Sequence, residues 1–161
     1  MSGDPGPGAD RRPRRVLLAN AARARIFERD PGNGALRELA DFVHPASRLP
    51  SRSLEHDRQG SLGKGASRTA FERATAVADR ERERFAQQLA QHLETTARGG
   101  DLPAWALLAS SPFLGHLQAA LGPAATARLV ARAERDLTGL PIRELERRLR
   151  SLLPAGALPP D

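Results

Sequence analysis

The sequence predicts an α/β fold in which five strands form one mixed sheet and helices pack on it. Short apolar runs separated by turn residues fill residues 16–43, the pattern of an antiparallel meander. A continuous apolar run at residues 104–110 is typical of a strand buried on both faces. Amphipathic helical patterns lie before and after that run, at residues 79–98 and 138–153. A meander followed by alternating helices and strands indicates the α/β class.

The first three strands are expected between residues 16 and 43. The run VLLAN (residues 16–20) is almost wholly apolar, and ARIFER (residues 24–29) follows after a tight connection. The run PGNG (residues 31–34) then supplies the proline and glycines of a turn. Residues 35–43 are also compatible with a helix because Leu, Glu and Ala favour one, but the Pro/Gly boundary and short length favour a strand. As a strand, this segment has four side chains on one face: Leu36, Glu38, Ala40 and Phe42.

The strongest helix pattern follows a long segment with few apolar residues. Phe85, Leu89 and Leu93 recur every four residues, and a pair of glycines ends the pattern. Asp79 is a suitable N-cap, so the helix is expected to begin there. Residues 71–78 could extend it towards the N-terminus, and the sequence leaves that open.

The remaining elements alternate between strand and helix. Residues 104–110 form the fourth strand, and residues 111–121 form a helix with Pro112 near its first turn. Residues 127–137 are a weaker strand candidate, and residues 138–153 form the last helix. Right-handed crossovers place the fourth strand beside the first and the fifth outside it. The expected strand order is therefore 3-2-1-4-5, which is the ribonuclease-H-like arrangement.

Length and composition indicate one globular domain. The 161 residues are 40% hydrophobic and 27% charged, which is ordinary for a folded protein. Residues 14–153 are expected to form a single α/β domain. Residues 1–13, rich in Gly, Pro and Asp, are expected to be a disordered tail, and residues 154–161 a flexible C-terminus.

The sequence predicts a cytoplasmic location and no membrane contact. No apolar run approaches the roughly 20 residues needed to cross a bilayer. The basic N-terminal segment has no apolar stretch behind it, so it does not resemble a secretory signal. The chain has no cysteine, which excludes disulfides and thiolate chemistry.

The net charge of +6 is unevenly placed along the chain. Residues 44–70, here called the basic segment, carry a net charge of +3, whereas residues 16–43 and 71–98 are each neutral. The basic segment has almost no apolar content, so it is expected to be a long loop insertion outside the core. A cationic loop on a near-neutral body is suited to binding a polyanion. Its basic residues are Arg48, Arg52, Arg58, Lys64 and Arg68.

Several segments, in order and with matching spacing from Val16 to Leu152, resemble one protein family. The segments are VLLANAARARIFE, HPASR, DRQG, ERFAQQLAQHL, LLASSPFLGHLQAAL and RDLTGLPIRELERRL. They resemble the bacterial host attachment protein family, small proteins described as required for attachment to host cells. In that family the first strand often ends in Asp-Gly, where this chain has Asn20-Ala21. A role for that acid therefore does not transfer to this chain.

The family is in turn similar to the central domain of archaeal and eukaryotic peptide release factors. Those factors carry a Gly-Gly-Gln loop before a long helix, and the basic segment occupies the corresponding place. The motif itself is absent, because Gln59 precedes Gly60 and does not follow a pair of glycines. The resemblance therefore implies a non-enzymatic protein that contacts the ribosome or structured RNA through the basic segment. Aromatic residues are only 4% of the chain, so phosphate contacts rather than base stacking would dominate.

A hydrolase or metal-dependent enzyme is the alternative interpretation. His44, His56 and Asp57, with Glu55 beside them, are residue types used for metal binding and acid–base chemistry. Their spacing matches no rigid ligand motif, so no metal or cofactor is predicted. Two-metal nuclease chemistry is also not expected, because the central strands end without carboxylates.

Ser110 and Ser111 follow a central strand and precede a helix. Ligands of open α/β sheets commonly bind at such a position, where free backbone N–H groups can bind an anion. The two serines are therefore candidate anion-binding residues, and Ser111 is also a candidate nucleophile. A simple helix N-cap role for Ser111 explains the same residues.

Overall fold

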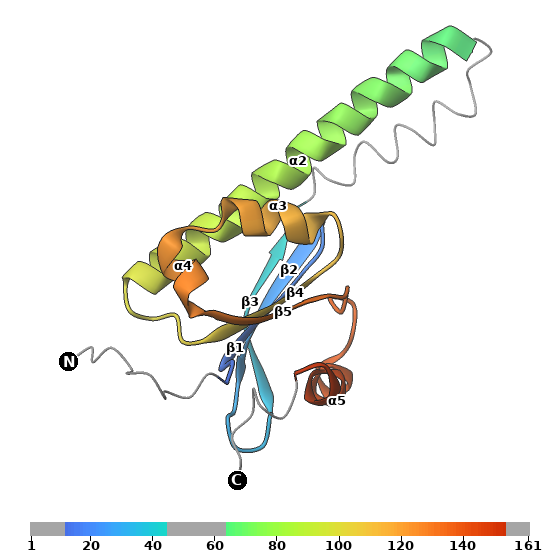
Figure 1. The fold of residues 1–161 in the computed structure, drawn as a ribbon. Coiled ribbons are helices and arrows are strands. Elements are labelled where there is room, and N and C mark those ends of the chain that lie inside the picture. The colour runs from blue at the N-terminus through green and yellow to red at the C-terminus, as the bar shows by residue number, and fades with distance from the viewer. Residues whose placement is uncertain (1–11, 45–63, 154–161) are drawn as a thin grey trace.

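The computed structural model describes residues 12–44 and 64–153, and within residues 64–67 it describes the backbone alone. Five strands form one open mixed sheet in the order β3-β2-β1-β4-β5, as the sequence predicts (Figure 1). The pairs β1–β2 and β2–β3 are antiparallel, and the pairs β1–β4 and β4–β5 are parallel. The strands are β1 (Arg15–Ala19), β2 (Arg23–Arg29), β3 (Leu36–Val43), β4 (Trp105–Ala109) and β5 (Leu129–Glu134).

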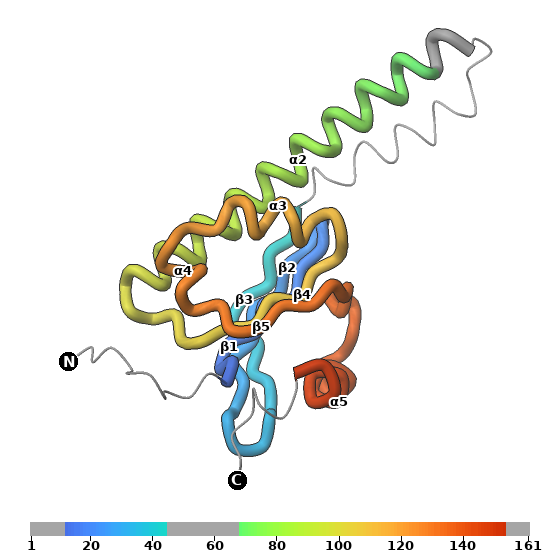
Figure 2. The backbone as a smooth tube through the Cα atoms, in the orientation of Figure 1, coloured from blue at the N-terminus to red at the C-terminus, as the bar shows by residue number. Residues whose placement is uncertain are grey.

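Helices cover both faces of the sheet (Figures 1 and 2). The helices α2 (Lys64–Arg98), α3 (Phe113–Ala120) and α4 (Pro123–Arg128) pack on one face, and α5 (Ile142–Leu152) packs on the other. The central strands β1 and β4 are buried because their side chains alternate between the two cores. Leu17 faces the core under α2, and Val16 and Leu18 face the core under α5.

A β-bulge changes the facing of β3. Ile26 pairs with Ala40 and the next residue of β2 pairs with Glu38, so Leu39 has no partner on β2. Leu36 consequently packs in the core under α5, whereas Ala40 and Phe42 pack against the core under α2. The expectation that all the even-numbered residues of β3 share one face is therefore wrong, because one extra residue reverses the alternation.

Helix α2 is longer than expected. It begins at Lys64 and not at Asp79, so residues 64–70 of the predicted loop are helical. Asp79 lies inside the helix, where its carboxylate accepts a hydrogen bond from Arg82. Residues 66–98 contain neither Gly nor Pro, and their many Ala, Arg and Glu residues favour continued helix. The C-terminal half of α2 covers the sheet, and the N-terminal part projects beyond it (Figure 1).

Two further elements differ from expectation in detail. The short helix α4, with Pro123 in its first turn, is not indicated by the sequence pattern, which suggests only a strand beginning at residue 127. The N-terminal tail is expected to extend through residue 13, but Pro13 is buried. The other residues predicted as terminal tails or loop, 1–11, 45–63 and 154–161, lie outside the described part of the chain. Among the described residues, no helix combines the length and the apolar character needed to cross a membrane.

Candidate functional site

The structure describes only the end of the basic segment. Arg48, Arg52 and Arg58 lie outside the described residues. Lys64 opens α2, and its side chain also lies outside the description. Arg68 is exposed on the projecting part of α2 and forms no ion pair with another described residue. Of the five residues predicted to bind nucleic acid, only Arg68 has a side chain that the structure describes. No carboxylate in the described ranges forms an ion pair with it.

His44, the first residue of the basic segment, packs against the core, contrary to the expectation that the segment lies outside it. Its backbone N–H donates to Ala22 O at the end of β3. Its ring stacks on Phe85 at a centroid distance of 4.9 Å, and its Nε2 lies 3.0 Å from Glu81 Oε2. The other candidates of the enzyme interpretation, Glu55, His56 and Asp57, lie outside the described residues. His44 thus fastens β3 to α2, and within residues 12–44 and 64–153 no three His, Cys, Asp or Glu residues gather as a metal site.

Ser110 and Ser111 connect β4 to α3. The backbone N–H of Ser110 donates to Ala19 O, and its carbonyl accepts from the N–H of Leu114. The N–H of Ser110 is therefore engaged and not free for an anion. Ser111 is exposed, and the N-cap of α3 is Pro112, without a side-chain hydrogen bond. The N-cap explanation of Ser111 is accordingly wrong.

A polar cluster lies where β1 and β5 end. Asn20 Oδ1 accepts from the backbone N–H groups of Ala22 and Arg23, both at 2.8 Å, and so closes the turn into β2. Asn20 Nδ2 donates to Asp136 Oδ2 at 3.1 Å and to Thr138 Oγ1 at 2.9 Å. Burial would raise the pKa of Asp136, but hydrogen bonds from Thr138 and Asn20 outweigh burial and lower it. The members of this carboxyl-end cluster thus satisfy one another.

Arg25 extends the cluster beneath the sheet. It is buried, and its guanidinium donates to the carbonyls of Thr138 and Leu140 at 3.1 and 2.8 Å. It also forms an ion pair with Glu38 at 2.8 Å and lies 4.9 Å from the ring centroid of Phe27. This buried arginine therefore fixes the connection between β5 and α5 and has carboxylate and carbonyl partners.

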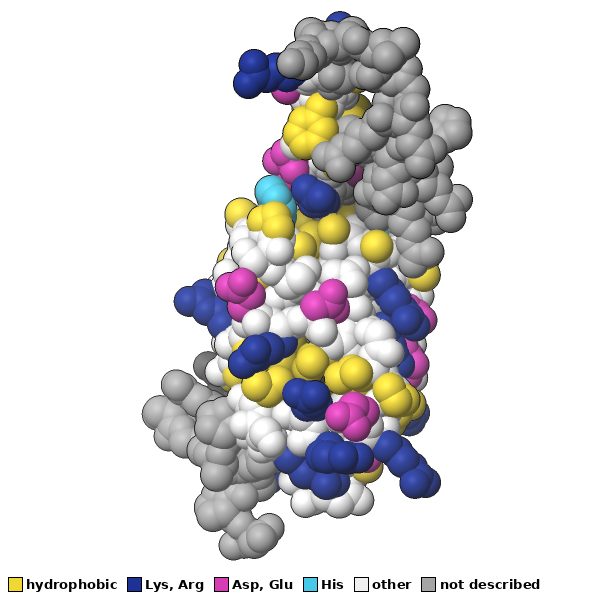
Figure 3. Space-filling view, turned by 90° about the vertical axis from the view of Figure 1, so that its right-hand side faces the viewer, with side chains coloured by type: hydrophobic (Ala, Val, Ile, Leu, Met, Phe, Trp, Pro, Cys, Tyr) yellow, Lys and Arg dark blue, Asp and Glu magenta, His cyan; other side chains and the backbone are white. Residues whose placement is uncertain are grey.

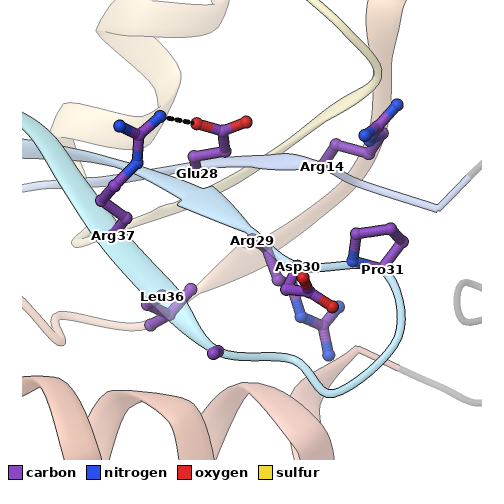
Figure 4. Close-up of a pocket in the computed structure, with 8 residues that line it drawn as sticks. Arg14, Glu28, Arg29, Asp30, Pro31, Leu36 and Arg37 are labelled. Atoms are coloured by element: carbon purple, nitrogen blue, oxygen red, sulfur yellow. Dashed lines mark hydrogen bonds and ion pairs between the residues drawn. The ribbon is translucent and has the colours of Figure 1, made fainter.

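The opposite end of the sheet contains a cavity of about 350 Å³ at the turn between β2 and β3 (Figure 4). We call it the hairpin cavity. In Figure 4, Glu28 and Arg37 lie on one side of the strands, and the side chain of Arg29 points to the other side, towards α5. The residues lining the cavity are Arg14, Glu28, Arg29, Asp30, Pro31, Ala35, Leu36 and Arg37.

The two carboxylates of the hairpin cavity are already bound. Glu28 pairs with Arg37, and this hydrogen bond lowers the pKa of Glu28. Asp30 accepts from the backbone N–H groups of Asn33 and Gly32, which lower the pKa of Asp30. Neither carboxylate forms an ion pair with Arg14 or Arg29, although the charge of Arg14 lowers the pKa of both carboxylates further.

Arg29 is the unusual residue of this cavity. Its side chain is only 2% exposed, and its Nε and Nη1 atoms have no hydrogen-bond partner among the described residues. Burial lowers the pKa of Arg29, and the nearby Arg150 lowers it further. Arg29 is not among the residues predicted from the sequence, although the alternation of ARIFER puts Arg25, Phe27 and Arg29 on one core-facing side of β2. The presence of arginine at two core-facing positions of β2 is the sequence signal that could have identified Arg29.

Elsewhere on the body, basic and acidic side chains are intermixed. Figure 3 shows this on one face, with arginine side chains predominating at the end remote from the projecting part of α2. Many of the arginines form ion pairs. Examples among the described residues are Arg23–Asp41, Arg25–Glu38, Arg37–Glu28, Arg84–Glu81 and Arg98–Glu94.

Most of the chain matches one family of known proteins. The model of a family described as "Protein required for attachment to host cells" matches residues 15–149, a range that begins with β1, contains all five strands of the described sheet and ends within α5. A search of curated proteins found no match.

Proposed function

We propose that this chain, which belongs to the family of proteins required for attachment to host cells, is a non-enzymatic protein that contacts the ribosome or structured RNA through its basic segment. The proposal includes a cytoplasmic location, so that any effect on attachment is indirect. One observation supports it above the others: α2 begins inside the basic segment and projects beyond the sheet (Figure 1). The chain on the N-terminal side of this helix carries the remaining basic residues of the segment.

The charge distribution favours a polyanionic partner for this end of the molecule. Arg68 and Arg73 are exposed on the projecting part of α2, and neither forms an ion pair with another described residue. Arginines on the sheet, such as Arg23 and Arg37, pair with carboxylates. Unpaired cations on a projecting helix can contact phosphates without first breaking internal ion pairs. Binding of this kind depends strongly on salt and weakly on nucleotide sequence.

The proposal includes a similarity of the family to release-factor domains, which would have the same partner. A long helix begins within the last residues of the basic segment, and in those domains a long helix follows the loop that enters the ribosome. Because Gln59 and Gly60 stand in the reverse order and no pair of glycines precedes a glutamine, the proposal is limited to binding and excludes peptide release.

Co-sedimentation with ribosomes over a range of salt concentrations tests the proposal. The test variant replaces the five basic residues of the segment by glutamine; these are Arg48, Arg52, Arg58, Lys64 and Arg68. We expect the unmodified chain to bind at low salt and to bind more weakly as the salt concentration rises. In the variant, the slope of log K against log salt should be smaller by ~0.7–0.9 for each phosphate that is no longer neutralised.

The matched control variant has the same net charge but keeps the basic segment. It replaces five exposed body arginines by glutamine; these are Arg128, Arg132, Arg135, Arg143 and Arg147. We expect this variant to retain most of the binding. Absence of co-sedimentation at low salt, or an equal loss in both variants, would refute the proposal. Cell fractionation tests the location separately.

A further inference from the structure

A buried guanidinium without an acceptor requires an explanation. Arg29 lies on the face of β2 that packs towards α5, where Leu36 is also buried. Two of its nitrogen atoms, Nε and Nη1, are buried and have no partner in the described parts of the chain. A buried charge without a hydrogen-bonding counterion is strongly unfavourable. Arginine at this position therefore destabilises the isolated fold unless something else binds it.

The surroundings of Arg29 add positive charge. Arg150 of α5 approaches the same turn. A Cβ atom placed on Gly34 would lie 3.7 Å from Arg150 Nε and 3.8 Å from Arg29 Nη2. Gly34 itself has a positive φ of 74°. Arg14 lines the hairpin cavity and forms no ion pair with another described residue. Three guanidinium groups thus lie around one turn, and no carboxylate in the described ranges pairs with them.

Acidic side chains near the turn have other partners. Glu28 binds Arg37, and Asp30 binds two backbone N–H groups of the turn. Glu146 of α5 accepts from the backbone N–H of Leu36 at 2.9 Å. None of these carboxylates forms an ion pair with Arg29, so the charge of Arg29 is left for an external anion.

We propose that the hairpin cavity binds a phosphate group, with Arg29 as its buried ligand and with Arg14 and Arg150 adding long-range attraction. Guanidinium N–H groups bind phosphate oxygens by charge-assisted hydrogen bonds. Arg14, Arg29, Arg37 and Arg150 outnumber Glu28 and Asp30 around the cavity, and this net positive charge favours a multiply charged oxyanion over the single charge of a carboxylate. The volume of about 350 Å³ exceeds that of a phosphate ion and fits a small phosphorylated molecule. This site lies on residues other than the basic segment, and it does not rest on the proposed RNA contact.

Thermal unfolding of the full chain in inorganic phosphate, at constant ionic strength set with sodium chloride, tests the site. We expect a saturable rise of Tm for the unmodified chain, because a ligand that binds only the folded state stabilises it. Arg29→Met is expected to raise Tm without phosphate, since it removes the unpaired buried charge, and to lose the phosphate response. The dissociation constant should rise at least about tenfold, which corresponds to ~1.4 kcal/mol.

Arg132→Met, which makes the same change of charge on an exposed residue of β5, is the control and should respond as the unmodified chain does. Acetate at the same ionic strength distinguishes a carboxylate site from a phosphate site. Backbone amide chemical shifts of residues 29–36 in the unmodified chain give a second readout that needs no variant. A Tm that rises equally in chloride or acetate, an undiminished response of Arg29→Met, or unchanged amide shifts would each overturn the proposal.

Discussion

Replacing Asn20 by Asp tests the carboxyl-end cluster most directly. The substitution keeps the shape of the side chain and keeps Oδ1, which accepts from two backbone N–H groups of the turn. It replaces only the Nδ2 donor, which binds Asp136 at 3.1 Å and Thr138 at 2.9 Å, by a charged acceptor. Two carboxylates would then face each other at hydrogen-bond distance.

The expected loss of unfolding free energy in Asn20→Asp comes from two effects. Two unit charges 4 Å apart repel by ~1 kcal/mol in bulk water and by ~4 kcal/mol at an effective dielectric constant of 20. Asp136 is exposed, so we take about 2 kcal/mol for the repulsion. Loss of a hydrogen bond to a charged acceptor contributes ~1 kcal/mol more at such an exposed position. The free energy of unfolding should therefore fall by about 3 kcal/mol at pH 7.

Urea denaturation at pH 7 and at pH 4 gives the decisive comparison. In the unmodified chain the pKa of Asp136 is lowered, so its contribution to stability is present at neutral pH and is lost as the pH falls through that lowered value. In Asn20→Asp, repulsion raises one pKa of the pair above its value in the unfolded chain. The penalty is then full at neutral pH and disappears as the pH falls towards the unfolded value of about 3.9.

Asn33→Asp is the matched control. Asn33 also uses its Oδ1 to close a turn, accepting from the N–H of Ala35, but its Nδ2 donates to no carboxylate among the described residues. The control should not lower the free energy of unfolding by more than about 0.5 kcal/mol, because Arg150 lies beside this turn and favours a carboxylate there. If Asn20→Asp loses less than about 1 kcal/mol at pH 7, or loses the same amount at both pH values, Asn20 and Asp136 do not form the contact on which the prediction depends.

Three further predictions concern packing, backbone and helix capping. Leu149→Ala on α5 should lower the free energy of unfolding by about 2–5 kcal/mol, measured by urea denaturation, whereas Ile142→Ala, 37% exposed on the same helix, should lose less than about 1 kcal/mol. Gly34→Ala should cost about 1–2 kcal/mol because φ is 74°, and Gly139→Ala, with a negative φ and open space, much less. Glu94 accepts from the N-terminal backbone N–H groups of α4, and these hydrogen bonds lower the pKa of Glu94. Glu94→Gln should therefore lower the free energy of unfolding at pH 7. The difference from the unmodified chain should shrink as the pH falls through the lowered pKa of Glu94.

Strand order was predictable because the two central strands are apolar along their length. The runs that contain Val16 and Leu107 have to be buried on both faces, and the right-handed crossover rule then determines which strands flank them. Local patterns were less informative on β3, where the bulge at Leu39 reverses the alternation without any glycine to mark it. A bulge of this kind is set by the pairing with β2, which the sequence of β3 alone does not contain.

The start of α2 was mispredicted because no residue marks it. Asp79 has the chemistry of an N-cap, but residues 66–78 contain neither Gly nor Pro and include enough Ala, Arg and Glu to continue a helix. His44 was misplaced for a different reason: its burial depends on Phe85 and Glu81, which are distant in sequence. Tertiary contacts decide the position of His44, whereas the helix propensity of residues 66–78 extends α2 past Asp79.

The candidate ligand sites also depend on contacts that the sequence alone does not contain. Ser110 and Ser111 occupy the position where ligands usually bind in open α/β sheets. Several polar groups at this edge, however, already have partners: the Ser110 N–H donates to β1, and Asn20 binds Asp136. A ligand binding here would replace existing hydrogen bonds and gain little net free energy.

Binding free energy is available where polar groups lack partners, and that condition is met at the opposite end of the sheet. Two nitrogen atoms of Arg29 have no acceptor in the described residues, so an anion there gains a charge-assisted hydrogen bond without breaking one. The β2–β3 turn, which lines the hairpin cavity, and the projecting part of α2 lie at opposite ends of the molecule (Figure 1). Phosphate bound at Arg29 should consequently leave the basic segment free, and Arg29→Met should co-sediment with ribosomes as the unmodified chain does. Loss of both activities in that one variant would mean that the two surfaces are coupled through the sheet or that they form a single site.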